Sequence, residues 1–368
     1  MNVLIVSHLF DDVASGPSWS VPAYAESLSK LDNVVWIDTT KFEMAHWRIV
    51  SSYHKLGKQT NLRLSYINKV YFTPDVVIFQ GFNFLEQPIF AFQLRKAGIP
   101  YIIVPRGSLT NDAIHNHAYL KKWFAHKILL NRFVRKASAV QFLTQEERKE
   151  SGDKWNKKSI VIPNGFSNNI VKNKFSDNGI KGVFIGRLDM YHKGIDVLLQ
   201  AIMLVQGQMR EAGFIIDFYG PKKYDYERLI KEISLLGISD LLTVHGPIAG
   251  EDKIRVLLSS DLFVLTSRFE GHPMGLIEAL SFGLPALVTE GSNMMSKIEE
   301  YDAGWPVKKN DKKTIGDTIL NIIEEKHLLE VKGRNARQLS LEYDWASLAE
   351  RLHVELDSII ESEKTYTF

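Results

Sequence analysis

A pair of glutamates in the second half of the sequence is the feature best suited to chemistry. Glu270 and Glu278 are separated by seven residues and follow Leu262–Thr266, an apolar run typical of a buried strand. Pro273 suits the first turn of a helix, so Glu270 should lie in the preceding loop and Glu278 just over one turn inside the helix. Carboxylates placed in this way could bind hydroxyl groups, such as those of a sugar ring and a ribose. The alternative is that they only complement the helix dipole.

The start of the same helix could bind an anion. Met274 and Gly275 would follow Pro273, and amides in the first turn of a helix have no partner within the helix. Together with the helix dipole, such amides can hold a phosphate group.

A second loop carries two cations. Arg187 and Lys193 lie between the predicted strand Gly182–Ile185 and the predicted helix Ile195–Leu204. Arginine offers two-point hydrogen bonding and lysine a compact charge, so the pair suits a diphosphate. Solvated surface charge is the alternative. The loop has neither the G-x-G-x-x-G nor the Walker pattern, so the markers of dinucleotide-binding and P-loop proteins are missing.

Three residues in the first half are weaker candidates. Gly16 follows the first predicted strand, where a glycine would allow a ligand to approach the backbone closely. Arg106 follows the predicted strand Tyr101–Val104 and could contact an anionic acceptor or a transferred sugar. His115 comes shortly afterwards, and a lone histidine is more often a surface residue than a catalyst.

The composition argues against several kinds of chemistry. The chain contains no cysteine, which excludes disulfides, thiol nucleophiles and cysteine-ligated metals. It has no D-x-D, H-E-x-x-H or G-x-S-x-G pattern, so common metal and serine-hydrolase markers are missing. We therefore expect neither a metal site nor a bound cofactor.

The apolar pattern predicts an α/β protein with two Rossmann-like domains facing across a cleft. The chain has 368 residues, which favours two domains, and the strand–helix alternation restarts after the turn at Asn164-Gly165. The expected domains are residues 1–165, with an amphipathic C-terminal helix at 345–368 packing back on them, and residues 166–344. Residues 39–73 should form a less regular insert. The predicted strands are Asn2–Ser7, Val34–Ile37, Asp75–Gln80, Tyr101–Val104, Ala139–Leu143, Ile160–Ile162, Gly182–Ile185, Phe214–Tyr219, Leu241–His245, Leu262–Thr266 and Ala286–Val288.

Charge is distributed unevenly between these halves. Residues 1–165 hold 21 Lys and Arg against 13 Asp and Glu, whereas residues 166–368 hold 24 against 30. The basic half could contact a phosphate-rich or anionic lipid surface. The basic stretch Tyr119–Lys136 fits a membrane-surface helix, although a packed helix with a basic outer face is preferred. Without a leader, a long apolar run or an aromatic-basic RNA motif, we expect a cytoplasmic protein that binds no nucleic acid. We expect any membrane contact to be peripheral, at the inner face of the cell membrane.

The two charged loops together resemble those of family 4 (group 1) retaining glycosyltransferases with the GT-B fold. Glu270 and Glu278 match the family's E-x7-E motif, and Arg187 with Lys193-Gly194 resembles its diphosphate clamp. Asn164-Gly165 matches the turn at the family's domain boundary. The resemblance extends over nearly the whole chain and is strongest over residues 160–305.

The resemblance implies transfer of a sugar, with retention at the anomeric carbon and without a metal, from a nucleotide diphosphate that is most often UDP. The implied acceptor is a saccharide or lipid-linked saccharide of cell-surface polysaccharide assembly, such as capsule, O-antigen or exopolysaccharide. The N-terminal domain would bind the acceptor and the C-terminal domain the donor. The implied catalytic residues are Arg187, Lys193 and Glu270. The implied donor site comprises Gly16, Arg187, Lys193, Glu270, Gly271, Met274, Gly275 and Glu278, and Arg106 and His115 are candidates for the acceptor or sugar.

Other functions remain open on sequence alone. A nucleotide-sugar epimerase, or another relative that transfers no sugar, would share the fold. A two-lobed solute-binding protein and an inactive scaffold are further alternatives. Conversion of the donor that depends on an added acceptor would distinguish a transferase from an epimerase or a scaffold.

Overall fold

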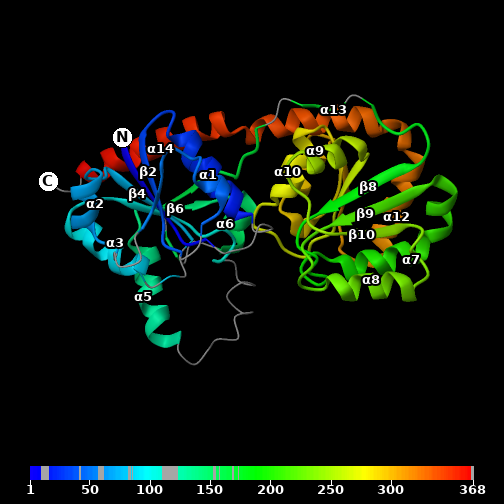
Figure 1. Ribbon diagram of the computed structural model, residues 1–368, viewed down its shortest axis with the longest axis horizontal. Coiled ribbons are helices and arrows are strands. Elements are labelled where there is room, and N and C mark those ends of the chain that lie inside the picture. Colours follow the sequence, from blue (N-terminus) through cyan, green and yellow to red (C-terminus); the bar gives the residue numbers. More distant parts are fainter. Residues whose placement is uncertain are drawn as a thin grey trace. The chain divides into compact units, whose positions relative to one another are not determined.

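The chain forms two compact units, each built on its own parallel sheet. The computed structural model describes residues 1–9, 16–40, 43–56, 62–81, 84, 86–109, 123–151, 155–156, 158–167, 170–172 and 174–365. The N-terminal unit comprises residues 1–165 and 345–368, and the C-terminal unit comprises residues 166–344 (Figure 1). The division falls at the two positions expected from the sequence.

The sheet of the N-terminal unit has seven parallel strands among the described residues. Their order across the sheet is β3-β2-β1-β4-β5-β6-β7. The order reverses between β1 and β4, which is the arrangement of a doubly wound sheet. The strands are β1 (Asn2–Ser7), β2 (Asn33–Asp38), β3 (Tyr53–Lys55), β4 (Val76–Gln80), β5 (Tyr101–Val104), β6 (Ala139–Phe142) and β7 (Ser159–Val161).

Helices cover both faces of this sheet, so its central strands are apolar throughout. Val3 and Ile5 of β1 belong to one core cluster, and Leu4 and Val6 belong to the other. The first cluster lies under α1 (Pro17–Leu28) and α14 (Trp345–Thr365), and the second under α2 (Leu64–Val70), α3 (Glu86–Lys96) and α5 (Trp123–Arg135). The unit also contains η1 (Ala45–Trp47) and α6 (Gln145–Ser151).

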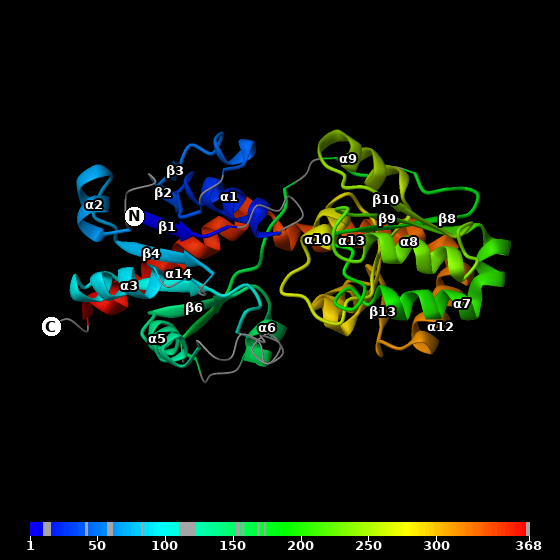
Figure 2. The same cartoon turned by 60° about the horizontal axis from the view of Figure 1, so that its bottom comes forward.

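The C-terminal helix α14 belongs to the N-terminal unit, as expected from the sequence. Leu348, Leu352 and Leu356 are buried on one side of it, at the four-residue spacing of a helix face. The Trp345 ring meets Tyr24 of α1 edge-on at 6.3 Å. Figures 1 and 2 both show α14, in red, beside the strands of this unit.

Helix α5 packs into the core of its unit. Leu130, Phe133 and Val134 are buried in the second cluster. The preferred prediction for the basic stretch, a packed helix, is therefore correct for this part of it. None of the described helices has both the length and the apolar character needed to cross a membrane.

The C-terminal unit repeats the doubly wound plan with six parallel strands among its described residues. Their order is β10-β9-β8-β11-β12-β13, with the reversal between β8 and β11. The strands are β8 (Ile180–Ile185), β9 (Phe214–Tyr219), β10 (Leu242–His245), β11 (Leu262–Leu265), β12 (Ala286–Thr289) and β13 (Gly304–Val307).

Helices flank this second sheet as well. Figure 1 shows α7 and α8 on one side of it and α9, α10 and α13 on the other. The helices are α7 (Ile195–Ala212), α8 (Tyr226–Leu235), α9 (Gly250–Ser259), α10 (Met274–Ser281), α11 (Met295–Glu300), α12 (Lys312–Glu324) and α13 (Leu329–Ser340), with short turns η2 (Glu290–Ser292), η3 (Lys326–Leu328) and η4 (Leu341–Tyr343).

The sequence predictions missed two short edge strands. β3 lies in the expected irregular insert and pairs with β2. β13 contains Pro306 and pairs with β12 at the edge of the second sheet, where a missing amide is tolerated. The other predicted strands all form, with ends within two residues of those expected.

The reversal point of the C-terminal sheet positions both charged loops. The loop with Arg187 and Lys193 follows β8, and the loop with Glu270 follows β11, its neighbour in the sheet. Because the carboxyl ends of parallel strands share one edge, the two loops must lie side by side. Ligands of open α/β sheets bind at such a reversal.

Candidate functional site

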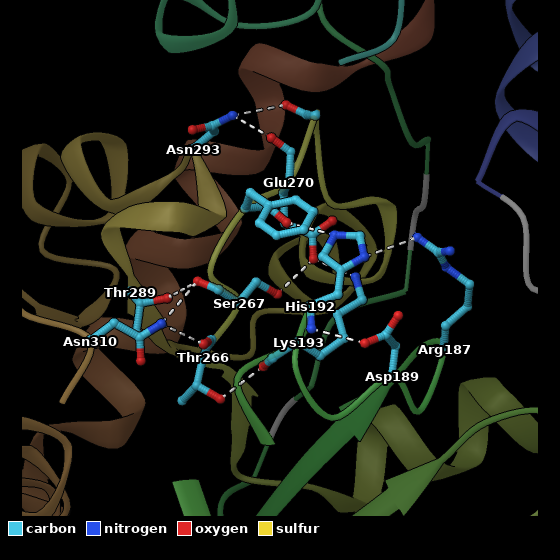
Figure 3. Close-up of polar contacts among 12 residues, drawn as sticks. Arg187, Asp189, His192, Lys193, Thr266, Ser267, Glu270, Thr289, Asn293 and Asn310 are labelled. Carbon is cyan, nitrogen blue, oxygen red and sulfur yellow. Dashed lines mark hydrogen bonds and ion pairs between the residues drawn. The ribbon is translucent and has the colours of Figure 1, made fainter. Parts of the chain in front are cut away.

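The two charged loops of the C-terminal unit meet at an ion pair. Lys193 Nζ donates to Glu270 Oε1, and Ser267 Oγ donates to the same oxygen at 2.6 Å (Figure 3). The two charged side chains are only 11% and 10% exposed. The structure therefore brings together the cation and the carboxylate on which the sequence analysis depends.

Glu270 is held in its ionised form. Burial alone would raise its pKa, but the charge of Lys193 and the hydrogen bonds from Lys193 and Ser267 bring the pKa below its usual value. For the second carboxylate oxygen, Oε2, no partner is recorded among the described residues. This oxygen can accept from a ligand hydroxyl.

The turn before α7 requires a glycine. Gly194 has a φ of 62°, and a Cβ added to it would lie 2.0 Å from the carbonyl oxygen of Thr266. Thr266 Oγ1 in turn donates to the Lys193 carbonyl at 3.1 Å. Glycine at this position therefore lets the lysine loop pack directly on the carboxyl end of β11.

Side chains at and after the ends of β12 and β13 hold the loop that carries Glu270 through its backbone carbonyls. Asn293, after β12, donates to the carbonyls of Glu270 and Gly271, and Thr289 Oγ1 donates to the Ser267 carbonyl at 2.7 Å. Asn310, after β13, donates to the Thr266 carbonyl at 3.1 Å. The sequence analysis did not identify these three supporting residues.

Arg187 has no acidic partner among the described residues. Its Nη2 lies 3.4 Å from His192 Nδ1, and its guanidinium carbon lies 5.7 Å from the centre of the Tyr224 ring. Among the residues that the structure describes, no carboxylate oxygen lies within 4.0 Å of this guanidinium. The nearby Arg268, in contrast, forms a two-point pair with Asp196 at 2.7 and 2.8 Å. Arg187 is thus available to bind an anionic ligand.

The second glutamate has a lysine partner that the sequence analysis missed. Lys253 on α9 donates to Glu278 Oε2. Burial raises the pKa of Glu278, and the attraction of Lys253 offsets this only in part. Glu278 and Lys253 therefore form a second, separate ion pair on the same unit.

The first turn of α10 presents amides at the end of β8. The amides of Leu276 and Ile277 donate to the Pro273 carbonyl at 3.0 and 3.1 Å. For the amides of Met274 and Gly275, no acceptor is recorded within the described part of the chain. A Cβ on Gly275 would lie 2.9 Å from the carbonyl oxygen of Ile185, so this turn contacts the strand that leads to Arg187.

Replacing Gly275 with alanine should destabilise the C-terminal unit. The added methyl group would press on the backbone of Ile185 and on the Phe263 ring, 3.3 Å away. Overpacking of this kind costs about 1–3 kcal/mol, which chemical denaturation can measure. Gly207→Ala is the matched control, because nothing lies within 4 Å of a Cβ at that position of α7 and alanine favours a helix. Equal stability of the two variants would contradict the close contact.

The two described candidates in the N-terminal unit both lie near the first turn of α1, because Ser20 accepts from Arg106 and its amide donates to the Gly16 carbonyl at 2.9 Å. Gly16 caps α1 with a φ of −51°, which any residue can adopt, so a close approach to a ligand stays a prediction. His115 lies outside the described residues. Arg106 has a φ of 54°, and its guanidinium donates to Gln80 at 2.8 and 3.0 Å, to Ser20 at 2.9 Å and to Asn164 at 3.2 Å.

The environment of Arg106 is largely protein. Burial lowers the pKa of Arg106 to about 10, although Tyr24 and Glu147 act in the opposite direction. Its hydrogen bonds join the ends of β4, β7 and α1, so the observed contacts of Arg106 are structural. A contact with an acceptor or sugar stays a prediction. Within the described residues, no group of three or more His, Asp or Glu side chains is arranged to hold a metal ion.

The chain is similar to known proteins in sequence and in fold. Residues 166–339 match the family described as Glycosyl transferases group 1. Mannosylfructose-phosphate synthase of Agrobacterium fabrum is 25% identical over 212 residues, which cover 52% of this chain and 46% of that protein. An Escherichia coli protein named UDP-Gal:alpha-D-GlcNAc-diphosphoundecaprenol alpha-1,3-galactosyltransferase is 32% identical over 120 residues, or 31% of this chain and 27% of that protein. The matched segments thus span less than half the length of these two relatives.

The structural comparison covers both units. The crystal structure of Anabaena HepE in complex with UDP has a TM-score of 0.76 and 16% identity, covering 97% of this chain and 100% of that chain. At this identity the likeness shows the fold, which is the GT-B fold predicted from the sequence. The chain thus has the GT-B fold, and residues 166–339, with the loops that carry Arg187, Lys193, Glu270 and Glu278, match the model of the group 1 glycosyl transferases.

Proposed function

We propose that this chain is a retaining, metal-independent glycosyltransferase that moves a sugar from a UDP-sugar to a saccharide or lipid-linked saccharide. One observation carries the proposal. Arg187, a cation without a carboxylate partner among the described residues, lies in the same loop as Lys193, which contacts Glu270. A dianionic diphosphate beside a hydroxyl-rich sugar is the ligand that matches this set of charges.

Each group in the site has a place in donor binding. Arg187, Lys193 and the amides of Met274 and Gly275 would bind the diphosphate. Glu270 would accept hydrogen bonds from the sugar hydroxyls, and Glu278 from the ribose. These assignments combine the observed positions with the family resemblance. The UDP bound to the structural neighbour HepE supports the choice of nucleotide.

The chemistry would depend on stabilisation of the leaving group. As the bond between the anomeric carbon and the diphosphate breaks, negative charge develops on the leaving phosphate. Lys193 and Arg187 stabilise this charge, and fixed donors of this kind are worth about 3–4 kcal/mol each. The acceptor hydroxyl oxygen attacks the anomeric carbon from the face that the diphosphate leaves, so the configuration is retained. The departing phosphate oxygen takes the proton of that hydroxyl.

In this proposal the N-terminal unit binds the acceptor, and the acceptor is an intermediate of cell-surface polysaccharide assembly. The name of the E. coli relative specifies a diphosphoundecaprenol acceptor, which supports a lipid-linked saccharide. The excess of Lys and Arg in residues 1–165 supports peripheral contact with an anionic membrane, at its cytoplasmic face. Co-sedimentation with anionic vesicles at low salt tests this contact, and a protein that stays in the supernatant would contradict it.

Binding of UDP should raise the thermal stability of the protein. A ligand that binds only the folded state, at about 100 times its Kd, adds about 2.7 kcal/mol to the free energy of unfolding. UMP is the control, because it lacks the second phosphate and should stabilise the protein less at equal concentration. Equal shifts with the two nucleotides would contradict a diphosphate site.

Turnover assays then separate transfer from other reactions. We expect sugar release from the donor to increase when an acceptor saccharide is added, with a new glycosidic bond in the product. Conversion of the donor to another nucleotide sugar without an acceptor would instead favour an epimerase.

A further inference from the structure

His192 lies between the cationic loop and the glutamate loop, and its two ring nitrogens have different partners. One nitrogen, Nε2, lies 2.7 Å from the Phe269 carbonyl oxygen, and the other, Nδ1, lies 3.4 Å from Arg187 Nη2 (Figure 3). A carbonyl can only accept a hydrogen bond, and a guanidinium can only donate one. The ring satisfies both partners only as a neutral imidazole with its proton on Nε2.

The surroundings restrict movement of this ring. It stacks on the Phe269 ring with a centroid distance of 4.2 Å and an interplanar angle of 16°. Its backbone amide donates to Asp189 Oδ1 at 2.9 Å, and its carbonyl accepts from the Arg268 amide at 2.9 Å. His192 is therefore fixed on both sides, so that Nδ1 remains directed at Arg187.

Charged groups from both neighbouring loops act on the imidazole. From its own loop these are Arg187 and Lys193, and from the loop after β11 it is Glu270, whereas Asp189 and Arg268 contact the backbone of His192. Burial lowers the pKa of His192 below its usual value of 6.5, Glu270 opposes this, and Lys193 and Arg187 add to it. The neutral form is thus the dominant one at neutral pH.

We propose that His192 is a positioning residue, which as a neutral imidazole accepts a hydrogen bond from Arg187 and holds that guanidinium for the diphosphate. The inference rests on the proposed function, because Arg187 needs positioning only if an anion binds there. Neither the family match nor the sequence motif assigns a role to residue 192. Since no carboxylate holds Arg187 among the described residues, the imidazole is the polar side chain observed to direct it.

A ligand-free measurement tests the contact by itself. NMR titration of His192 should give a pKa below 6.5, with the Nε2–H tautomer at neutral pH. Arg187→Ala should raise this pKa, because it removes both a nearby cation and a donor that favours the neutral ring. An unchanged pKa, or the Nδ1–H tautomer, would overturn the inference whether or not the protein binds nucleotides.

A double-mutant cycle tests the effect on the donor. His192→Phe keeps a ring to stack on Phe269 but removes the acceptor, and should weaken UDP-sugar binding about 3- to 10-fold, the range of one hydrogen bond. In an Arg187→Ala background the same change should have almost no further effect. A UDP-sugar is used because its diphosphate has no terminal phosphate to titrate. His192→Asn, which restores an oxygen acceptor, should recover part of the affinity.

The outcomes of the cycle separate two failures. An equal loss in both backgrounds would mean that His192 has a general structural role, and it would overturn the inference. At a pH below the pKa of His192, the coupling between the two residues should disappear, because a protonated ring cannot accept. If the wild-type protein binds no nucleotide sugar, the proposed function fails, and the NMR titration still decides the role of His192.

Discussion

Lys193→Ala is expected to reduce kcat by about two to three orders of magnitude, which makes it one of the two most damaging single changes in the site. The ammonium would stabilise the charge that develops on the leaving diphosphate, and loss of one such fixed donor costs about 3–4 kcal/mol in the transition state. Steady-state turnover with the donor found by thermal screening measures this effect. The KM for the donor should change less than kcat, because the leaving charge grows during the reaction.

Lys193→Ala should also lower the stability of the protein. Lys193 is the ionic partner of Glu270, and both side chains are about nine-tenths buried. Removing the lysine leaves a buried carboxylate, which costs on the order of 3 kcal/mol of stability. Turnover should therefore be measured below the melting temperature of the variant. Lys174→Ala is the control, because Lys174 forms only an exposed pair with Asp177 on the same unit. Near-normal turnover of folded Lys193→Ala would refute the proposed role of Lys193.

The sequence predicts the site well where the residues follow apolar strands. Lys193 and Glu270 are 77 positions apart, yet each is preceded by a short apolar run and followed by a helix. In a parallel sheet, neighbouring strands place such loops side by side, so the contact follows from topology. The adjacency of the two strands at the reversal point is known only from the strand order of the sheet. No local sequence pattern contains that order.

The residues that were missed have no local signal. Asn293 and Asn310 hold the glutamate loop through its carbonyls, but nothing in their own segments distinguishes them from other loop asparagines. Lys253 looks like a solvated charge on an amphipathic helix until its contact with Glu278 is seen. His192 lies in the same loop as Arg187 and Lys193, and the sequence pattern of that loop indicates a role only for these two cations. Asn293, Asn310 and Lys253 depend on contacts between segments that are distant in sequence. For His192, the contact with Arg187 lies within one loop, but the contact with the Phe269 carbonyl joins distant segments.

Arg106 illustrates the opposite case. The sequence shows an arginine at a strand end beside a glycine, which is typical of a ligand contact. In the structure its guanidinium donates to Gln80, Ser20 and Asn164, so most of its hydrogen-bonding capacity is used within the unit. Position at the carboxyl edge of a strand therefore identifies residues close to a site, but only the contacts show which of them keep free donors.

Arg187→Ala is expected to lower kcat/KM for the donor by about two to three orders of magnitude with little change in stability. The first effect resembles that of Lys193→Ala, because in the proposed function both cations bind the same diphosphate. The second differs, because Arg187 has no carboxylate partner among the described residues and its removal leaves no unpaired buried charge. Measurement of kcat/KM together with the unfolding midpoint therefore separates the two residues.

Replacing Arg187 with lysine identifies what the guanidinium contributes beyond its charge. Arg187→Lys keeps the charge but loses the planar two-point geometry, and should recover only part of the lost kcat/KM. Arg255→Ala is the control, because Arg255 on α9 forms an exposed pair with Asp252 and should affect neither quantity appreciably. If Arg187→Ala retained normal kcat/KM, the diphosphate would not be bound by this loop. If instead it unfolded like Lys193→Ala, Arg187 would have to be part of the packing of the unit rather than a cation kept available for the donor.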